Sequence, residues 1–192
     1  GLHAARAFAD DDCRDGDCMK LLVLSDSHGR ADNIRLALER QATRPDTVLF
    51  LGDGLSDFRY VDLGDIPLIS VRGNCDMFRF DGGELPPSEL VVNLDGRNIL
   101  MLHGNTRGVE RGLDRAIMRA VEADAEVLLY GHTHVKYQAF IPAGTKLGLV
   151  TLAHDLYIFN PGSIGAPRDG GAPSFGVVDL CRTGVLCGWG RV

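Results

Sequence analysis

The sequence predicts an α/β protein in which two mixed sheets pack together with helices outside them. Two patterns support this fold class. Short apolar runs at 21–25, 47–51 and 68–71 are separated by longer connections, the first of them helical in pattern, which favours parallel strands joined by right-handed crossovers. From residue 89 onward the chain shows short strands with Gly and Pro between them, which favours a second sheet over a single doubly wound one.

The first part of the chain reads as a β-α-β-β unit with room for a second helix. The runs 21–25 and 47–51 are apolar and end in polar turns, as expected of strands that are buried on both faces. Residues 32–41 carry apolar side chains at the spacing of an amphipathic helix. The run 68–71 is a third strand, which ends in Gly73-Asn74.

The second part begins with a hairpin signal. Residues 89–94 and 98–102 flank Asp95-Gly96, a dipeptide that favours a tight turn between antiparallel strands. Residues 113–123 predict a helix, and 126–130 predict another buried strand. Further short strands are expected around 136–141, 156–160, 175–180 and 185–190.

Composition places the chain among ordinary globular proteins. Its 192 residues are enough for one substantial core, and 45% of them are hydrophobic. The net charge of −6 argues against a long nucleic-acid partner but leaves phosphate-bearing small molecules open, because bound metal ions supply positive charge locally. No apolar run approaches the roughly 20 residues of a transmembrane helix. We therefore expect a cytoplasmic protein that does not bind a membrane.

The first eighteen residues differ from the rest. They are rich in acids and lack the apolar stretch of a signal peptide, so we expect an extension over 1–18 and one domain over 19–192. The five cysteines are odd in number and irregularly spaced, which argues against a disulfide framework. We expect Cys13 and Cys18 to be free thiols.

Side chains that bind metals follow five of the apolar strands. They are Asp26, Asp53, Asn74, His103 and His132. In open α/β sheets the carboxyl ends of the strands form the ligand-binding edge, so these side chains are expected to converge. Carboxylate, imidazole and amide oxygen suit Mn, Fe, Zn, Ni or Co, whereas the lack of clustered thiolates argues against a structural zinc site.

Two further histidines extend this set. In Asp26-Ser27-His28 the alternation of an extended chain places the first and third side chains on one face, and His132-Thr133-His134 repeats the arrangement. Asp53 offers a carboxylate that can bridge two ions about 3.5–4 Å apart. We expect two divalent ions at this site. His3 and His154 stand outside the pattern and are interpreted as surface or structural residues.

In this order, the motifs LSDSHG, FLGDG, VRGNCD, LHG and GHTH resemble those of the calcineurin-like metallophosphoesterases. The later segment FNPGSIGAPR is similar to that of their small prokaryotic phosphodiesterase branch, whose members also carry Gly-Asn-Cys-Asp. The resemblance implies a four-layer α/β/β/α sandwich and a dinuclear site, with manganese as the first choice of metal. By position it implies one ion on Asp26, His28, Asp53 and His134, and a second on Asp53, Asn74, His103 and His132.

Two positions depart from the family pattern. Larger relatives have a histidine after the motif asparagine, where it is thought to protonate the leaving group, and this chain has Cys75. Branch members often read His-Gly-His where this chain has Asn105 as the third residue. These departures affect leaving-group chemistry and substrate choice more than metal binding.

The reaction we expect is in-line attack on phosphorus by a metal-bound hydroxide, with Asn74 fixing the second ion. The proton donor is left open among Cys75, Asp76 and water, and a weak donor favours good leaving groups. Ser163, Arg168 and Asn105 are expected near the phosphate, although a structural turn and a surface arginine are equally good interpretations of Ser163 and Arg168. The arginines Arg72, Arg107 and Arg111 are further candidates.

Several enzymatic activities are compatible with the same set of metal-binding residues. A small phosphodiester is the expected substrate, and a phosphomonoester, a nucleotide pyrophosphate or a nuclease substrate are the alternatives. A retromer subunit is similar to this branch in fold yet acts as a scaffold with a degraded metal site, and the seven intact ligand positions argue against that role here. Exposed strand edges would permit a homo-oligomer, either a dimer or a tetramer.

Overall fold

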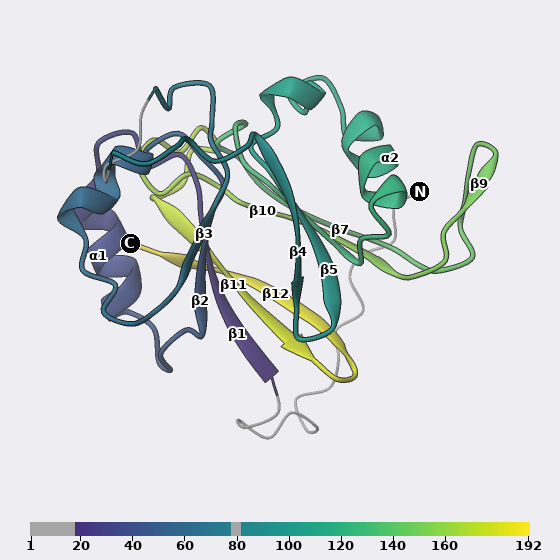
Figure 1. Ribbon diagram of the computed structural model, residues 1–192, viewed down its shortest axis with the longest axis horizontal. Coiled ribbons are helices and arrows are strands. Elements are labelled where there is room, and N and C mark those ends of the chain that lie inside the picture. The colour runs from purple at the N-terminus through teal and green to yellow at the C-terminus, as the bar shows by residue number, and fades with distance from the viewer. Residues whose placement is uncertain (1–17, 78–81) are drawn as a thin grey trace.

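Two five-stranded sheets form the centre of the computed structural model, which describes residues 18–77 and 82–192 (Figure 1). In chain order the elements are β1 (Cys18–Leu24), α1 (Ala31–Glu39), β2 (Thr47–Phe50), the 3-10 helix η1 (Leu55–Tyr60), β3 (Leu68–Ser70), β4 (Glu89–Leu94), β5 (Arg97–Leu102), the 3-10 helix η2 (Asn105–Arg107), α2 (Asp114–Glu122), β6 (Val127–Tyr130), β7 (Lys136–Ile141), β8 (Lys146–Leu147), β9 (Val150–Thr151), β10 (Leu156–Pro161), β11 (Ser174–Cys181) and β12 (Gly184–Arg191).

Both sheets are mixed. The first has the order β12-β11-β1-β2-β3, in which β1, β2 and β3 are parallel and β11 runs antiparallel to β1. The second has the order β4-β5-β6-β10-β7, with β5, β6 and β10 parallel between antiparallel outer strands. Neighbouring parallel strands place their carboxyl ends at one edge of each sheet. The predicted metal-binding residues come shortly after these strand ends in the sequence.

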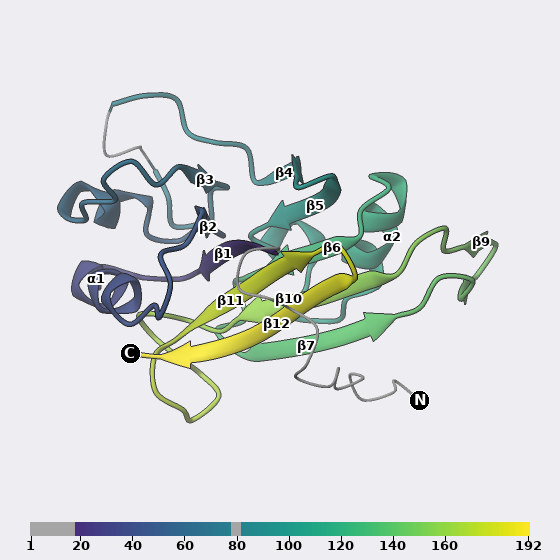
Figure 2. The same ribbon diagram turned by 90° about the horizontal axis from the view of Figure 1, so that it is seen from below.

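Three apolar clusters separate the layers. The central cluster fills the space between the sheets and includes Leu49 of β2, Met101 of β5 and Phe159 of β10, all fully buried. A second cluster joins the outer face of the first sheet to α1 and η1, and a third joins the second sheet to α2. Figures 1 and 2 show the two helices on opposite sides of the sheets. The predicted four-layer α/β/β/α sandwich is confirmed.

The predicted strands and helices are present, most with ends shifted by one or two residues. The structure adds elements that the sequence did not predict: the 3-10 helix η2 and the short hairpin β8–β9, which has Leu149 fully exposed at its turn. It also shows η1 after β2, where the sequence left room for a helix. Within the described ranges, none of the helices has the length and apolar character needed to cross a membrane.

One prediction about cysteine is wrong. Cys18 is joined to Cys181 by a disulfide, across 163 residues of sequence. The two residues face each other in the antiparallel register of β1 and β11, with their Cα atoms 4.3 Å apart, which is the short separation of a directly opposite pair. Sequence spacing carries no information about this register. Cys18 also begins β1, one residue before the expected domain start, whereas Cys13 lies outside the described residues.

Candidate metal centre

The predicted metal ligands converge at the carboxyl ends of strands from both sheets. Asp26 follows β1, Asp53 follows β2, Asn74 comes after β3, and His103 follows β5. His132 and His134 lie on the turn between β6 and β7. Residues far apart in the sequence therefore meet at one place, because strand order sets which turns are neighbours.

The backbone of this site is unusual. Five of the seven predicted ligands have a positive φ: Asp26 (56°), His28 (44°), Asp53 (62°), His132 (67°) and His134 (59°). In the two described stretches of chain, the remaining non-glycine residues of this kind are Asp95 in the β4–β5 turn and Asp124 after α2. Such conformations cost roughly 1–3 kcal/mol each and persist where surrounding contacts enforce them, most often at functional sites.

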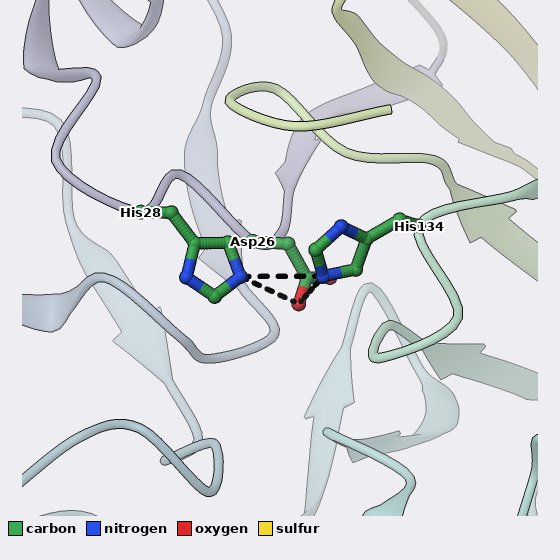
Figure 3. A group of neighbouring side chains, drawn as sticks. All are labelled: Asp26, His28 and His134. Carbon is green, nitrogen blue, oxygen red and sulfur yellow. Dashed lines mark hydrogen bonds and ion pairs between the residues drawn. The ribbon is translucent and has the colours of Figure 1, made fainter. Parts of the chain in front are cut away.

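Asp26, His28 and His134 form a first cluster (Figure 3). The Nε2 atom of His134 lies 3.1 Å from Oδ1 of Asp26, and the Nε2 atom of His28 lies 3.7 Å from the same oxygen. The two Nε2 atoms are 3.2 Å apart. Figure 3 shows both rings pointing toward the Asp26 carboxylate from opposite sides.

Hydrogen bonds fix the tautomer of His134. Its Nδ1 atom lies 2.6 Å from the carbonyl oxygen of Ala166, which can only accept, so Nδ1 carries the proton and Nε2 of the neutral ring has a free lone pair. Oδ1 of Asp26 is buried and has no hydrogen-bond donor. A carboxylate oxygen and imidazole lone pairs that face one another repel unless a cation lies between them. The cluster therefore fits a metal ion.

A second cluster lies on the other side of Asp53. His103 is fully buried, and its Nδ1 atom donates to the carbonyl oxygen of Leu51 at 2.7 Å, which leaves Nε2 as the ligand atom. That Nε2 atom is 3.1 Å from Oδ1 of Asn74, 3.2 Å from Nδ1 of His132 and 3.4 Å from Oδ2 of Asp53. Carboxylate, amide and imidazole atoms of metal-ligand type thus converge at a second place, as a second cation would require.

The charges of the site agree with this interpretation. Burial opposes ionisation of Asp26 and Asp53, but the neighbouring imidazoles outweigh it and hold the pKa of both carboxyls below the usual value. Burial lowers the pKa of His103, but Asp53, Asp26 and the backbone oxygen of Leu51 together outweigh it, so its pKa is raised overall. The two buried carboxylates keep negative charge at neutral pH, which favours cation binding.

Asp76 makes structural contacts. Its Oδ2 atom accepts the backbone N–H groups of Asp53 and Gly73, each at 2.8 Å, and its Oδ1 atom accepts those of Gly54 and Leu55, each at 2.9 Å. Both oxygens are thereby used to hold the turn that carries Asp53. This arrangement supports a positioning role for Asp76.

Cys75 lies beside the clusters. Its thiol is exposed and lies 3.3 Å from Nδ2 of Asn74, and its backbone N–H donates to Oδ1 of Asp53 at 2.7 Å. Burial raises the pKa of this thiol, and the negative charge of Asp53 raises it further. Cys75 is therefore a neutral thiol at physiological pH in the metal-free protein.

The residues expected at the phosphate occupy different environments. Ser163 is fully buried, and its hydroxyl donates to the backbone oxygen of Asp26 at 2.8 Å and accepts from the N–H groups of Gly165 and Ala166. Its contacts match the structural-turn interpretation. The side chain of Arg168 is exposed, and its backbone N–H donates to the carbonyl oxygen of His134 at 3.0 Å.

Asn105 and the other candidate arginines also differ from one another in burial and in hydrogen-bond partners. Asn105 is half-buried, and its Oδ1 atom is buried with no hydrogen-bond partner. Arg107 is engaged by Glu89, with both Nε and Nη2 within 2.9 Å of the carboxylate, so it is not free for a substrate. Arg72 and Arg111 have exposed side chains.

Sequence reasoning missed three residues beside the ligands. Asp57 is buried and contacts the turn that carries His28, and Asn160 donates to Gly131 O and Thr133 Oγ1 in the turn before His134. Glu110 lies 3.7 Å from Nε2 of His132. Asn160 belongs to the FNPGS segment and was within reach of sequence reasoning. Nothing in the sequence distinguishes Asp57 or Glu110 from the other acidic residues of the chain.

The comparisons with known proteins agree with the site. Residues 19–183 match the family model described as the calcineurin-like phosphoesterase superfamily domain. The chain is 32% identical to the probable metallophosphoesterase YsnB of Bacillus subtilis over 162 residues, which cover 84% of this chain and 85% of that protein. The chain therefore belongs to the calcineurin-like phosphoesterase superfamily, and it is a metal-dependent enzyme of that class.

Two further relatives indicate which branch of the superfamily the chain resembles. The phosphodiesterase YfcE of Escherichia coli is 27% identical over 183 residues, which cover 84% of this chain and 88% of that protein. A crystal structure of a predicted phosphoesterase from Streptococcus pneumoniae superimposes with a TM-score of 0.66 at 24% identity and covers 90% of this chain and 88% of that chain. The resemblance to the small prokaryotic branch is confirmed.

Proposed function

We propose that this protein hydrolyses a small phosphodiester at a site that holds two divalent transition-metal ions, with manganese as the preferred metal. Asp26, His28, Asp53 and His134 would hold the first ion, and Asp53, Asn74, His103 and His132 the second. One observation carries the proposal. Oδ2 of Asp53 lies 3.9 Å from Nε2 of His28 and 3.4 Å from Nε2 of His103, so a single carboxylate oxygen borders both clusters of acceptor atoms.

When bound, two such ions supply a hydroxide nucleophile at neutral pH and offset charge on the phosphoryl oxygens. The chain's own residues provide the geometry. The backbone oxygens of Leu51 and Ala166 hold the rings of His103 and His134 so that each Nε2 lone pair faces the site. Oδ1 of Asn74 lies 3.1 Å from Nε2 of His103, so both atoms could bind the second ion.

A diester is preferred over a monoester for two reasons. The E. coli relative carries the name phosphodiesterase. In addition, the position beside Asn74 holds a neutral thiol in place of a stronger proton donor, which suits substrates whose leaving groups depart without protonation, such as aryl phosphodiesters. The net charge of −6 favours a small substrate over a long nucleic acid.

The test combines metal analysis with parallel assays. Metal-stripped protein would be titrated with Mn²⁺, and hydrolysis of a bis-aryl and a mono-aryl phosphate would be compared at equal concentration with Mn²⁺, Ni²⁺, Co²⁺, Zn²⁺ or Fe²⁺. We expect two bound equivalents and faster hydrolysis of the diester. Binding of fewer than two ions would overturn the dinuclear site, and preference for the monoester would identify the protein as a phosphomonoesterase. We also propose that residues 19–192, together with Cys18 at the start of β1, form one domain, which expression without residues 1–17 would test.

A further inference from the structure

We propose that Asp57, which is not a metal ligand, positions His28 and thereby sets the affinity of the first metal position. This inference rests on the proposed dinuclear site and adds a residue to it. Asp57 lies on η1, four residues after Asp53, and its side chain is only 5% exposed. A carboxylate buried to this extent costs free energy unless it accepts hydrogen bonds, so its partners show its role.

Those partners lie on either side of His28. Oδ2 of Asp57 accepts the hydroxyl of Ser27 at 2.5 Å and the backbone N–H of Gly29 at 2.9 Å. One buried carboxylate oxygen thus holds the residue before the ligand and the residue after it. Charge-assisted hydrogen bonds of this kind are stronger than neutral ones and fix geometry accordingly.

His28 depends on such support more than His134 does. Its backbone is in the left-handed region, with φ of 44°, and Gly29 follows with φ of 85°. Its side chain is 30% exposed, against 6% for His134. Within the described residues no backbone oxygen holds its Nδ1 atom, whereas Ala166 holds that of His134. The orientation of His28 is therefore set mainly by its turn.

Asp57 is itself firmly placed. Asp76 accepts the N–H groups of Gly54 and Leu55 at the start of η1, and the backbone N–H of Asp57 donates to the oxygen of Gly54 at 2.9 Å. A Cβ added at Gly54 would lie 1.9 Å from Oγ of Ser27 and 3.0 Å from Oδ2 of Asp57, so the Ser27–Asp57 pair packs directly against this glycine. The support runs from Asp76 through η1 to His28.

This support is specific for one of the two clusters. Within residues 18–77 and 82–192, the side-chain hydrogen bonds of Asp57 reach only the turn of residues 27–29, and none reaches Asn74, His103 or His132. Loss of Asp57 should therefore weaken the first metal position and leave the second nearly unchanged. Changes to residues that orient a ligand typically lower metal affinity by about 10–100-fold.

The experiment measures Mn²⁺ affinity by calorimetry in two backgrounds that isolate the positions. In His132→Ala protein the remaining ion reports the first position, and in His134→Ala protein it reports the second. We expect Asp57→Ala to weaken the first by about 10–100-fold and the second by less than about 2-fold. Asp57→Asn should recover part of the affinity, because its amide oxygen still accepts from Gly29, and Ser27→Ala should show a smaller loss of the same kind.

Asp62→Ala is the matched control, since Asp62 is an exposed carboxylate just after η1. Equal weakening of both positions by Asp57→Ala, or no weakening of the first, overturns the inference. Should Asp57→Ala fail to fold, Asp57→Asn and Ser27→Ala decide in the same way, because each removes at most part of the contact. Wild-type protein that binds fewer than two ions overturns the proposed function as well, whereas two ions with unchanged affinity in the Asp57 variants overturn only this inference.

Discussion

The two sheets hold their metal ligands by different means. On the first sheet, the turns that carry His28 and Asp53 are held through the backbone, because Asp57 and Asp76 accept N–H groups from those turns. The imidazole rings of His103 and His134, which follow strands of the second sheet, are held directly, by the oxygen of Leu51 after β2 and by that of Ala166 after β10. The turns of His28 and Asp53 are thus held through their backbone, whereas these two rings are also held at the side chain.

The turns of both sheets share one backbone feature. Residues with positive φ occur on both sides, and carboxylates accept N–H groups on both: Asp57 accepts that of Gly29, and Asp26 accepts that of His132 at 3.0 Å. The second sheet approaches the first closely at Gly131, where an added Cβ would lie 2.0 Å from Oγ of Ser25. This close approach lets Asp26 of the first sheet hold the turn of His132, whereas backbone oxygens hold the rings of His103 and His134.

Asp53 is the residue that both sides share, and its loss should have the largest effect. Asp53→Ala removes the carboxylate that borders both clusters, so we expect loss of both ions and a fall in activity of more than about 100-fold, beyond the range for changes to supporting residues. His134→Ala should lose only one ion. Metal content after gel filtration measures this directly. Retention of one full equivalent by Asp53→Ala would show that the two positions are independent.

The supports themselves should differ in strength. Asp76→Ala removes a carboxylate that accepts four backbone N–H groups, and we expect the free energy of unfolding of the metal-free protein to fall by about 2–4 kcal/mol. Asn160→Ala removes neutral hydrogen bonds to Gly131, Thr133 and Gly162, and we expect about 1–2 kcal/mol. Urea denaturation gives both values. A larger fall in the free energy of unfolding for Asn160→Ala than for Asp76→Ala would contradict this prediction.

The second sheet also carries an ionic contact that should respond to pH. Glu89 of β4 accepts from Arg107 of η2 and Arg119 of α2. Burial opposes its ionisation, but the two arginines outweigh this and lower its pKa. Because the pKa is lower in the folded state, the contribution is present above the unfolded-state pKa of about 4.3 and is lost as the pH falls through the folded-state value.

Glu89→Gln should therefore be less stable than wild type by about 1 kcal/mol at pH 7, and the difference should shrink as the pH falls below about 4. Urea denaturation at several pH values measures this. Glu122→Gln, at the end of α2, provides a control. A difference that persists unchanged in acid would show that packing, and not the charge of Glu89, is the cause.

The smallest effect is expected at Cys75, next to Asn74 on the first-sheet side. Cys75→Ala should leave hydrolysis of a diester with a good leaving group within about 3-fold of wild type, because no protonation is needed there. A poor leaving group should suffer a larger loss if the thiol donates the proton. Steady-state rates on a pair of substrates that differ in leaving-group pKa measure this. Full activity on the poor leaving group would remove Cys75 from the reaction.

Much of the fold and site was predictable because both depend on local pattern. Apolar runs identified the strands, and the polar residues directly after them identified the ligands Asp26, Asp53 and His103, since a strand end places its next residue at the sheet edge. The supports were not predictable in this way. Asp57 reads as one acid among many, and only the packing of η1 beside the His28 turn gives it a role.

The sequence by itself determined which residues are of metal-ligand type, that they follow strands and that the family is that of the metallophosphoesterases. The tertiary structure decided which distant residues contact each other. It paired Cys18 with Cys181 through strand register, buried Ser163 against the oxygen of Asp26, and engaged Asp76 with four backbone N–H groups. The reason is physical: strand patterns repeat along the chain and can be read there, whereas register and the approach of distant turns depend on how the sheets pack.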